Sequence, residues 1–175
     1  ICFPVSASSA TQMLSRMRDA GLAMRIHRGL WTLDSKIDPR MVPEYLTAPF
    51  SAYVSFQSAL SIHGMISQIP QITYVASLGP TRRFKTSMGT FSIHRLAPAF
   101  FGGFRTTNAG IRLATPEKAL LDVLYLGSAR SRLFSSLPEL EVRRGFDVVE
   151  AERWIERIVD PIRRTMVRTR WAKIL

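Results

Sequence analysis

The amino-acid sequence predicts an α+β fold. Apolar residues recur at helical spacing near both ends of the chain, short runs rich in β-branched and aromatic residues occupy its middle, and glycine or proline separates these segments. The chain has 175 residues, of which 46% are hydrophobic, so it is long enough to bury a core. The order of the segments indicates a mixed α/β domain with a small, mainly antiparallel sheet and C-terminal helices.

The first predicted element is an amphipathic helix over residues 7–20. Ala10, Leu14 and Met17 recur at the spacing of one helical face, and small polar or basic residues occupy the opposite face. Gly21 follows, and a glycine that is free to take a positive φ commonly ends a helix.

A short basic hairpin follows this helix directly. Residues 24–27 alternate between apolar and basic side chains, residues 28–29 form a turn, and residues 30–33 return. A helix followed at once by a hairpin is typical of the second half of a winged helix–turn–helix, whose helix lies in the DNA major groove and whose hairpin contacts the backbone. Because the first helix of that motif should precede Val5, we expect a further segment upstream of Ile1.

The exposed side of the predicted helix and the hairpin tip carry side chains suited to base edges and phosphates. Trp31 lies where the hairpin returns to the helix, and we expect it to have a structural role, covering Leu14 and Met17. A short amphipathic helix with a hairpin also occurs in proteins that bind no DNA, so this alternative stays open. The predicted DNA-binding residues are Ser8, Ser9, Thr11, Gln12, Ser15, Arg16, Arg25, His27 and Arg28.

Charge and composition favour a polyanionic partner. The net charge is +11 and the pI is about 11.0, which favours nucleic acid, although a basic surface can also be merely solvated. Cys2 is the one cysteine, so the sequence has no disulfide framework and no cysteine zinc site. With no apolar run that approaches a membrane span and no signal-peptide pattern at its start, we expect a cytoplasmic protein without a membrane partner.

The chain divides into three parts. Residues 1–34 form the partial winged helix–turn–helix, and residues 35–50, with three of the ten prolines, form a linker. Residues 51–175 form a second domain with a helical tail. Its predicted elements are a helix from residue 56 that ends at Gly64, strands over residues 72–78, 90–96 and 111–114, and helices over residues 115–126 and 148–158 and from residue 161 onward.

The sequence contains no recognisable active site. The thirteen acids are scattered, and the three histidines lie on three different predicted elements without the spacing of metal ligands. We expect His63 to cap or pack the end of its helix. Phosphate-binding and dinucleotide-binding glycine motifs are absent from the sequence. We therefore predict a protein that is not an enzyme, with no catalytic residues, no metal and no cofactor.

Several runs resemble the AbiEi-type antitoxins of type IV toxin–antitoxin systems. MLSRMRDAGLAMRIHRGLWTL is similar to the winged helix–turn–helix that opens those proteins. YVSFQSALSIHG, ITYVASLGPTRRF and IRLATPEKALLDVLYL are similar to their second domain, so the resemblance covers residues 5–126. The winged-helix part is shared by many regulators, whereas the combination with SALSIHG and ATPEKALLD is more specific.

The resemblance implies a bacterial protein that binds double-stranded operator DNA, represses its own operon and counters a nucleotidyltransferase-like toxin through its C-terminal domain. We expect a monomer in solution. Residues 81–118 hold seven basic residues against one acid, and we assign Arg82, Arg83 and Lys85 as candidates for toxin antagonism. Two alternatives remain: a winged-helix transcriptional regulator whose second domain senses a ligand or protein, and an RNA-processing or nucleotidyl-transferring enzyme.

Overall fold

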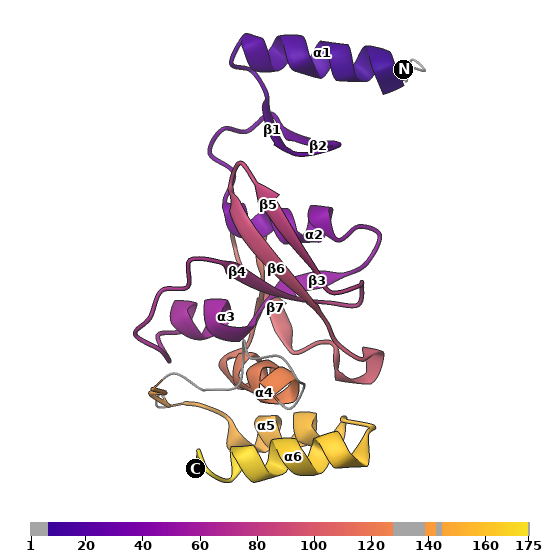
Figure 1. The fold of residues 1–175 in the computed structure, drawn as a ribbon. Helices are drawn as coiled ribbons and strands as arrows, with labels where there is room; N and C mark the ends of the chain where they lie inside the picture. The colour runs from indigo at the N-terminus through magenta and orange to yellow at the C-terminus, as the bar shows by residue number, and fades with distance from the viewer. Residues whose placement is uncertain (1–6, 128–138, 143–144, 175) are drawn as a thin grey trace.

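The computed structural model describes residues 7–127, 139–142 and 145–174. As predicted, it has a mixed α+β structure, with a two-stranded sheet near the N-terminus and a six-stranded sheet at its centre (Figure 1). Helix α1 (Ala7–Asp19) lies at one end of the molecule, and helices α5 (Val148–Glu156) and α6 (Pro161–Trp171) lie at the other. Among the described residues, no helix combines the length and the apolar character that a membrane span requires.

The predicted helix and hairpin near the N-terminus are present as α1, β1 (Met24–His27) and β2 (Leu30–Thr32). At the end of α1, the Gly21 amide donates to the Arg18 carbonyl at 2.9 Å, and the next amide donates to the Met17 carbonyl at 2.8 Å. This pair of bonds requires a residue in the left-handed conformation, which Gly21 supplies with a φ of 72°.

Residues 35–50, predicted to be a linker, contain the 3-10 helix η1 (Pro39–Met41) and helix α2 (Val42–Leu46). Pro39 and Pro43 lie in the first turns of these helices, where a missing backbone N–H costs nothing. Val42 is fully buried in a cluster that includes Ile26 of β1. This segment therefore packs against the hairpin and the central sheet.

The central sheet has the strand order β5-β6-β4-β3-β8-β7. Three of its pairings are antiparallel, whereas β4–β6 and β3–β8 are parallel, so the sheet is mixed. The parallel β4–β6 pair arises because the β5–β6 hairpin places β5 on the outside, at the edge. The strands are β3 (Ala52–Val54), β4 (Thr73–Ser77), β5 (Arg82–Thr86), β6 (Gly89–Arg95), β7 (Phe104–Thr106) and β8 (Arg112–Ala114).

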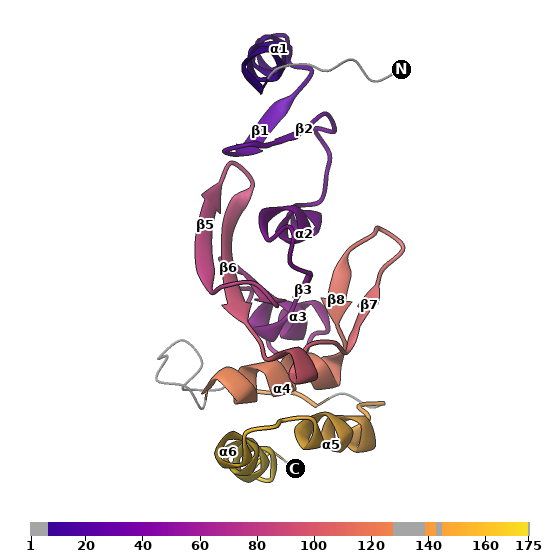
Figure 2. The same cartoon turned by 90° about the vertical axis from the view of Figure 1, so that its right-hand side faces the viewer.

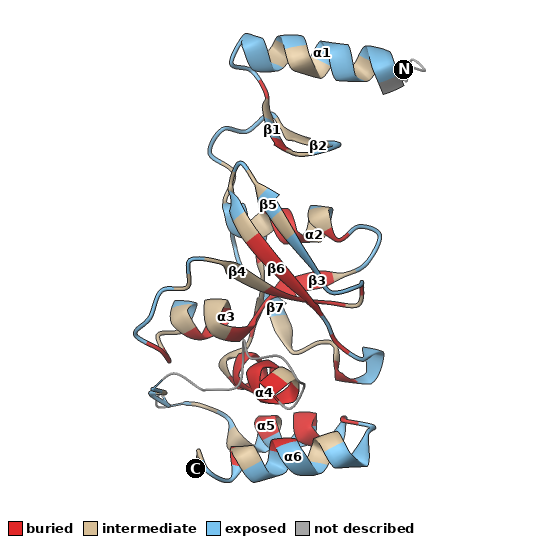
Figure 3. Ribbon diagram, in the orientation of Figure 1, coloured by how far each residue is buried: buried red, intermediate tan, exposed pale blue. Residues whose placement is uncertain are grey.

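The two faces of the sheet bury separate clusters. Ala52, Val75 and Phe91 face the smaller cluster, with α2 and the β1–β2 hairpin. Tyr53 and Ala76, the alternate residues on two of these strands, face the larger cluster with α3 (Phe56–Ile62) and α4 (Pro116–Gly127). Figures 2 and 3 show α4 between the sheet and the α5–α6 pair, with most of its length buried.

The predicted starts of the three C-terminal helices are confirmed by their capping bonds. The Thr115 hydroxyl accepts from the Lys118 amide at 3.3 Å, at the start of α4. The Asp147 carboxylate accepts from the Glu150 amide at 2.9 Å, and Asp160 accepts from backbone amides in the first turn of α6. Each cap satisfies amides that the helix itself leaves without partners.

Candidate nucleic-acid interface

Helix α1 presents most of the predicted base-reading side chains to solvent. Ser15 is the exception, because it is half-buried and its hydroxyl accepts a hydrogen bond from Arg18 Nη2 at 3.1 Å. Gln12 and Arg16 lie one turn apart, so an amide and a guanidinium project from the same side of the helix. The exposed residues among the predicted contacts on α1 are Ser8, Ser9, Thr11, Gln12 and Arg16.

Helix α1 stands clear of the other helices. Between residues 8 and 19 no side chain is buried, and Figure 3 shows this helix in pale blue and tan without red. Ala10, Leu14 and Met17, the predicted apolar side, are half-buried, and Met13 is 57% exposed. The polar face of α1 is therefore unobstructed by the rest of the described chain.

The β1–β2 hairpin presents two exposed arginines, Arg25 and Arg28. Gly29 in the turn has a φ of 77°, which allows the tight reversal that places Arg28 at the tip. The Arg25 guanidinium lies 5.8 Å from the centre of the Trp31 ring, within the range of a cation–π contact. Trp31 is half-buried, so its replacement should cost less than the roughly 3–5 kcal/mol expected for a fully buried tryptophan.

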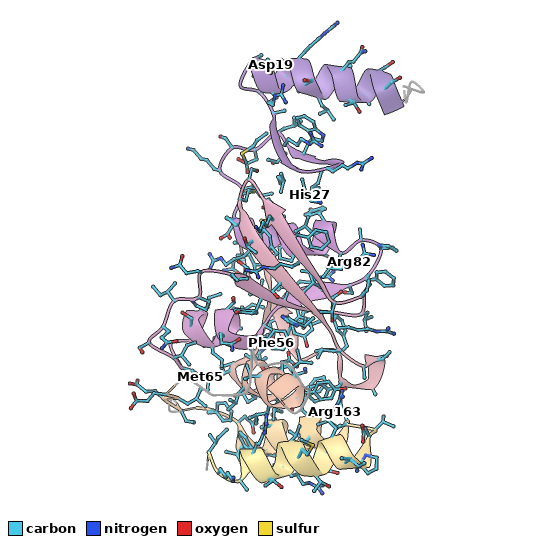
Figure 4. All side chains as sticks on the ribbon, in the orientation of Figure 1. Asp19, His27, Phe56, Met65, Arg82 and Arg163 are labelled. Carbon is cyan, nitrogen blue, oxygen red and sulfur yellow. The ribbon has the colours of Figure 1, made fainter. Side chains whose placement is uncertain are left out.

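His27, also predicted to contact DNA, packs against the central sheet. Its ring lies 5.4 Å from that of Phe84 on β5, in an edge-on arrangement. The β1–β2 register shifts between Arg25 and His27, so a bulge redirects the strand just before this contact. Figure 4 shows His27 below α1, on the side of the hairpin that faces the sheet.

The turn between β5 and β6 holds the hairpin in place. The Ser87 amide donates to the Ile26 carbonyl at 3.2 Å, and the Ser87 hydroxyl donates to the Arg25 carbonyl at 2.9 Å. Ile26 itself is buried in the cluster on that face of the sheet. The hairpin and the sheet therefore share a packed boundary, which the sequence did not predict.

The three candidates for toxin antagonism, Arg82, Arg83 and Lys85, lie on strand β5 and are exposed. This strand contacts β1, so the structure places one end of β5 against the hairpin, which is far from it in the sequence. Figure 4 shows Arg82 at the lower end of β5, away from the hairpin. The basic surface thus continues from the hairpin along the edge of the sheet.

A cavity of about 780 Å³ lies between α3, the β7–β8 hairpin and the first turns of α4 and α5. His63, which caps the C-terminal end of α3, hydrogen-bonds through Nε2 to the Ala114 carbonyl at 2.7 Å, which matches the predicted packing role. Two carboxylates in the cavity wall have partners. Glu117 accepts a hydrogen bond from the Asp147 amide, and Glu150 accepts one from the Trp154 indole. Within the described ranges, no group of three or more potential ligands is arranged to hold a metal ion.

A buried polar cluster around α4 was not predicted from the sequence. Lys118 and Asp122 form an ion pair, and both side chains are fully buried. Asp122 also accepts hydrogen bonds from the hydroxyls of Tyr53 at 3.0 Å and Ser55 at 2.6 Å. The Lys118 ammonium lies 3.9 Å from the centre of the Phe100 ring. A lysine and an aspartate four residues apart in a mostly apolar helix were the sequence signal for this pair.

Burial controls the titration of this cluster. It raises the pKa of Asp122 and lowers the pKa of Lys118, while the attraction between the two charges opposes both shifts. Burial, together with the neighbouring carboxylate, raises the pKa of Tyr53 well above its ordinary value. The partners of both charged groups are side chains within the fold, so we assign the cluster a structural role that joins α4 to β3.

Comparison with known proteins adds no further constraint. None of the protein-family models matches this chain, and no curated protein is significantly similar to it. The functional assignment therefore depends on the residues described above.

Proposed function

We propose that this protein is a bacterial type IV antitoxin of the AbiEi type, which binds operator DNA, represses its own operon and counteracts a nucleotidyltransferase-like toxin. In this proposal, α1 and the β1–β2 hairpin are the second half of a winged helix–turn–helix. The central sheet and C-terminal helices then carry the activity against the toxin.

The observation that carries the proposal is the unobstructed polar face of α1 beside two exposed hairpin arginines. Gln12 and Arg16 suit the acceptor and donor pattern of base edges in the major groove. Arg25 and Arg28 suit phosphates of the adjoining backbone, which fix the register of a protein on DNA. The net charge of +11 supports a polyanionic partner.

The assignment of toxin antagonism is supported by the resemblance of the runs at residues 53–64 and 111–126 to the second domain of this family. The first run contains the end of β3 and α3, and the second contains β8 and nearly all of α4. The two runs meet where the Tyr53 and Ser55 hydroxyls donate to Asp122 of the buried Lys118–Asp122 pair. Arg82, Arg83 and Lys85 provide an exposed basic surface on the same sheet. Charges of this kind mainly determine encounter rate and partner specificity.

The deciding experiment uses the full chain, its promoter and the adjacent open reading frame. Growth is scored when the adjacent frame is expressed with and without this protein, and a reporter measures promoter activity in the same cells. We expect restored growth together with repression. Gln12→Ala should relieve repression but leave growth protection intact, whereas an adjacent frame that is harmless alone would refute the antitoxin assignment.

A second candidate is a winged-helix regulator whose second domain senses a small molecule. The cavity of about 780 Å³, lined by His63, Arg105 and Glu117, favours it, since cavities of this size commonly accept small ligands. A metabolite that releases the protein from its operator, in cells where the adjacent frame has no toxic effect, would favour this candidate over the antitoxin.

A further inference from the structure

Within the part of the chain that the structure describes, strand β5 has a free edge. It is the outermost strand of the central sheet, next to β6 alone in the strand order, and Figure 2 shows no other strand on its outer side. All five of its residues pair with β6 in antiparallel register. In such a pair, alternate residues direct their backbone N–H and C=O groups away from the partner strand. Part of β5 therefore offers hydrogen-bonding groups to a further strand.

The side chains that border this edge are basic on both faces of the sheet. Arg82 shares a face with Phe84, and Arg83 and Lys85 lie on the opposite face, because side chains alternate along a strand. All three basic side chains are exposed, and none of the ion pairs within the described residues involves them. An approaching strand would thus meet positive charge above and below its own backbone.

This arrangement selects for the charge of the approaching strand. Basic residues on an edge strand repel the same edge of a second copy, which protects against self-association. The same charges attract carboxylates at cross-strand positions, where opposite charges stabilise the pairing. A DNA duplex would approach one face of the sheet, whereas the basic residues of β5 are divided between both faces and surround the edge.

We propose that the edge of β5 binds an extended acidic segment of a protein partner by β-strand addition. Backbone hydrogen bonds to β5 hold the segment, and Arg82, Arg83 and Lys85 select its acidic side chains. Under the proposed function the partner is the toxin, and the inference depends on that function only for the identity of the partner.

The test uses the full chain and a labelled synthetic peptide, Thr-Glu-Val-Glu-Val-Glu-Thr, that suits an extended conformation. We expect the peptide to bind and to slow hydrogen exchange of backbone amides within residues 82–86. Arg83→Glu with Lys85→Glu should weaken binding about tenfold, because two cross-strand attractions become repulsions. The matched control is Arg105→Glu, which reverses an exposed arginine on β7 at the opposite edge of the sheet and should leave binding unchanged.

Three results would overturn the inference. The first is absence of peptide binding, and the second is equal binding of a peptide with the same side chains but with every backbone nitrogen methylated, which cannot donate ladder hydrogen bonds to β5 in any register. The third is unchanged hydrogen exchange in β5 together with displacement of the peptide by duplex DNA, which would make this surface a nucleic-acid contact. This assay contains no toxin, so a failure of the proposed antitoxin function shows separately, in the growth experiment.

Discussion

Lys118 and Asp122, one turn apart on α4, form an ion pair whose side chains are both fully buried. The Asp122 carboxylate also accepts hydrogen bonds from two hydroxyls, those of Tyr53 on β3 and of Ser55, which follows β3. Gly103 makes room for the lysine, because a Cβ at this glycine would lie 2.8 Å from Lys118 Cγ. The pair therefore fixes the position of α4 against the sheet at the junction of several elements.

We predict strong coupling between the two members of this pair. Lys118→Met or Asp122→Leu alone leaves one buried charge without its partner and should lower the free energy of unfolding by about 3–5 kcal/mol. The double variant should lose less stability than either single variant, because it leaves only the two hydroxyls of Tyr53 and Ser55 without an acceptor. Urea unfolding of the four proteins measures the cycle.

The control for this cycle is an exposed pair on α5. Arg153 lies 3.9 Å from Glu150, and Arg153→Ala should change stability by less than about 1 kcal/mol. If the stability losses of the two single variants add up to the loss of the double variant, Lys118 and Asp122 do not depend on each other.

We predict that His94 makes the protein less stable in mild acid. Burial lowers the pKa of His94 from 6.5 to about 4, because the sheet and α3 surround its ring. Below pH 6.5 the unfolded chain binds a proton that the folded chain does not, so stability falls from pH 6.5 to about pH 4 and then levels off. The shift corresponds to a loss of up to about 3 kcal/mol.

Unfolding midpoints measured across this pH range test the prediction. His94→Gln should flatten the curve between pH 6.5 and 4, whatever its effect on stability at neutral pH, because it removes the titrating ring. His63→Gln, at the end of α3, is the matched control and should leave the slope attributed to His94 in place. A curve that keeps its slope in His94→Gln would assign the acid sensitivity to other groups.

Local signals predicted much of the fold. Gly21 marked the end of α1, and Thr115, Asp147 and Asp160 marked the starts of the C-terminal helices, because capping depends on a few adjacent residues. The strand order was not predicted. The outer position of β5 makes β6 parallel to β4, and this arrangement results from packing on both faces of the sheet rather than from any local pattern.

The sequence predicted which side of α1 is exposed, but not how the hairpin packs against the sheet. The exposure of Gln12 and Arg16 follows from helical spacing, which the sequence shows directly. The contact of His27 with Phe84 joins two hairpins that are far apart in the chain, and a single sequence carries no signal for that proximity. The same reason explains why the basic residues of β5 were assigned a role without reference to the hairpin.

We predict that the hairpin arginines contact phosphates. Arg25→Ala or Arg28→Ala should weaken binding to every DNA sequence and reduce the slope of log affinity against log salt by about one unit for each phosphate that the variant no longer neutralises. Arg105→Ala removes an exposed arginine from the far edge of the sheet and should leave the slope unchanged. Equal slopes for the hairpin variants and the parent protein in a salt titration would mean that the hairpin does not contact the backbone.

Gln12 provides the sharpest test of base reading, because its side chain is exposed on the polar face of α1 and carries no net charge. An amide that forms two hydrogen bonds with an adenine edge contributes about 1–3 kcal/mol of discrimination, so Gln12→Ala should weaken operator binding by that amount. Binding to random DNA should hardly change, since phosphate contacts are retained. Gln71→Ala, an exposed glutamine between α3 and β4, controls for loss of any surface amide. If Gln12→Ala weakens binding to operator and to random DNA equally, at the same salt concentration, Gln12 contacts the DNA backbone instead.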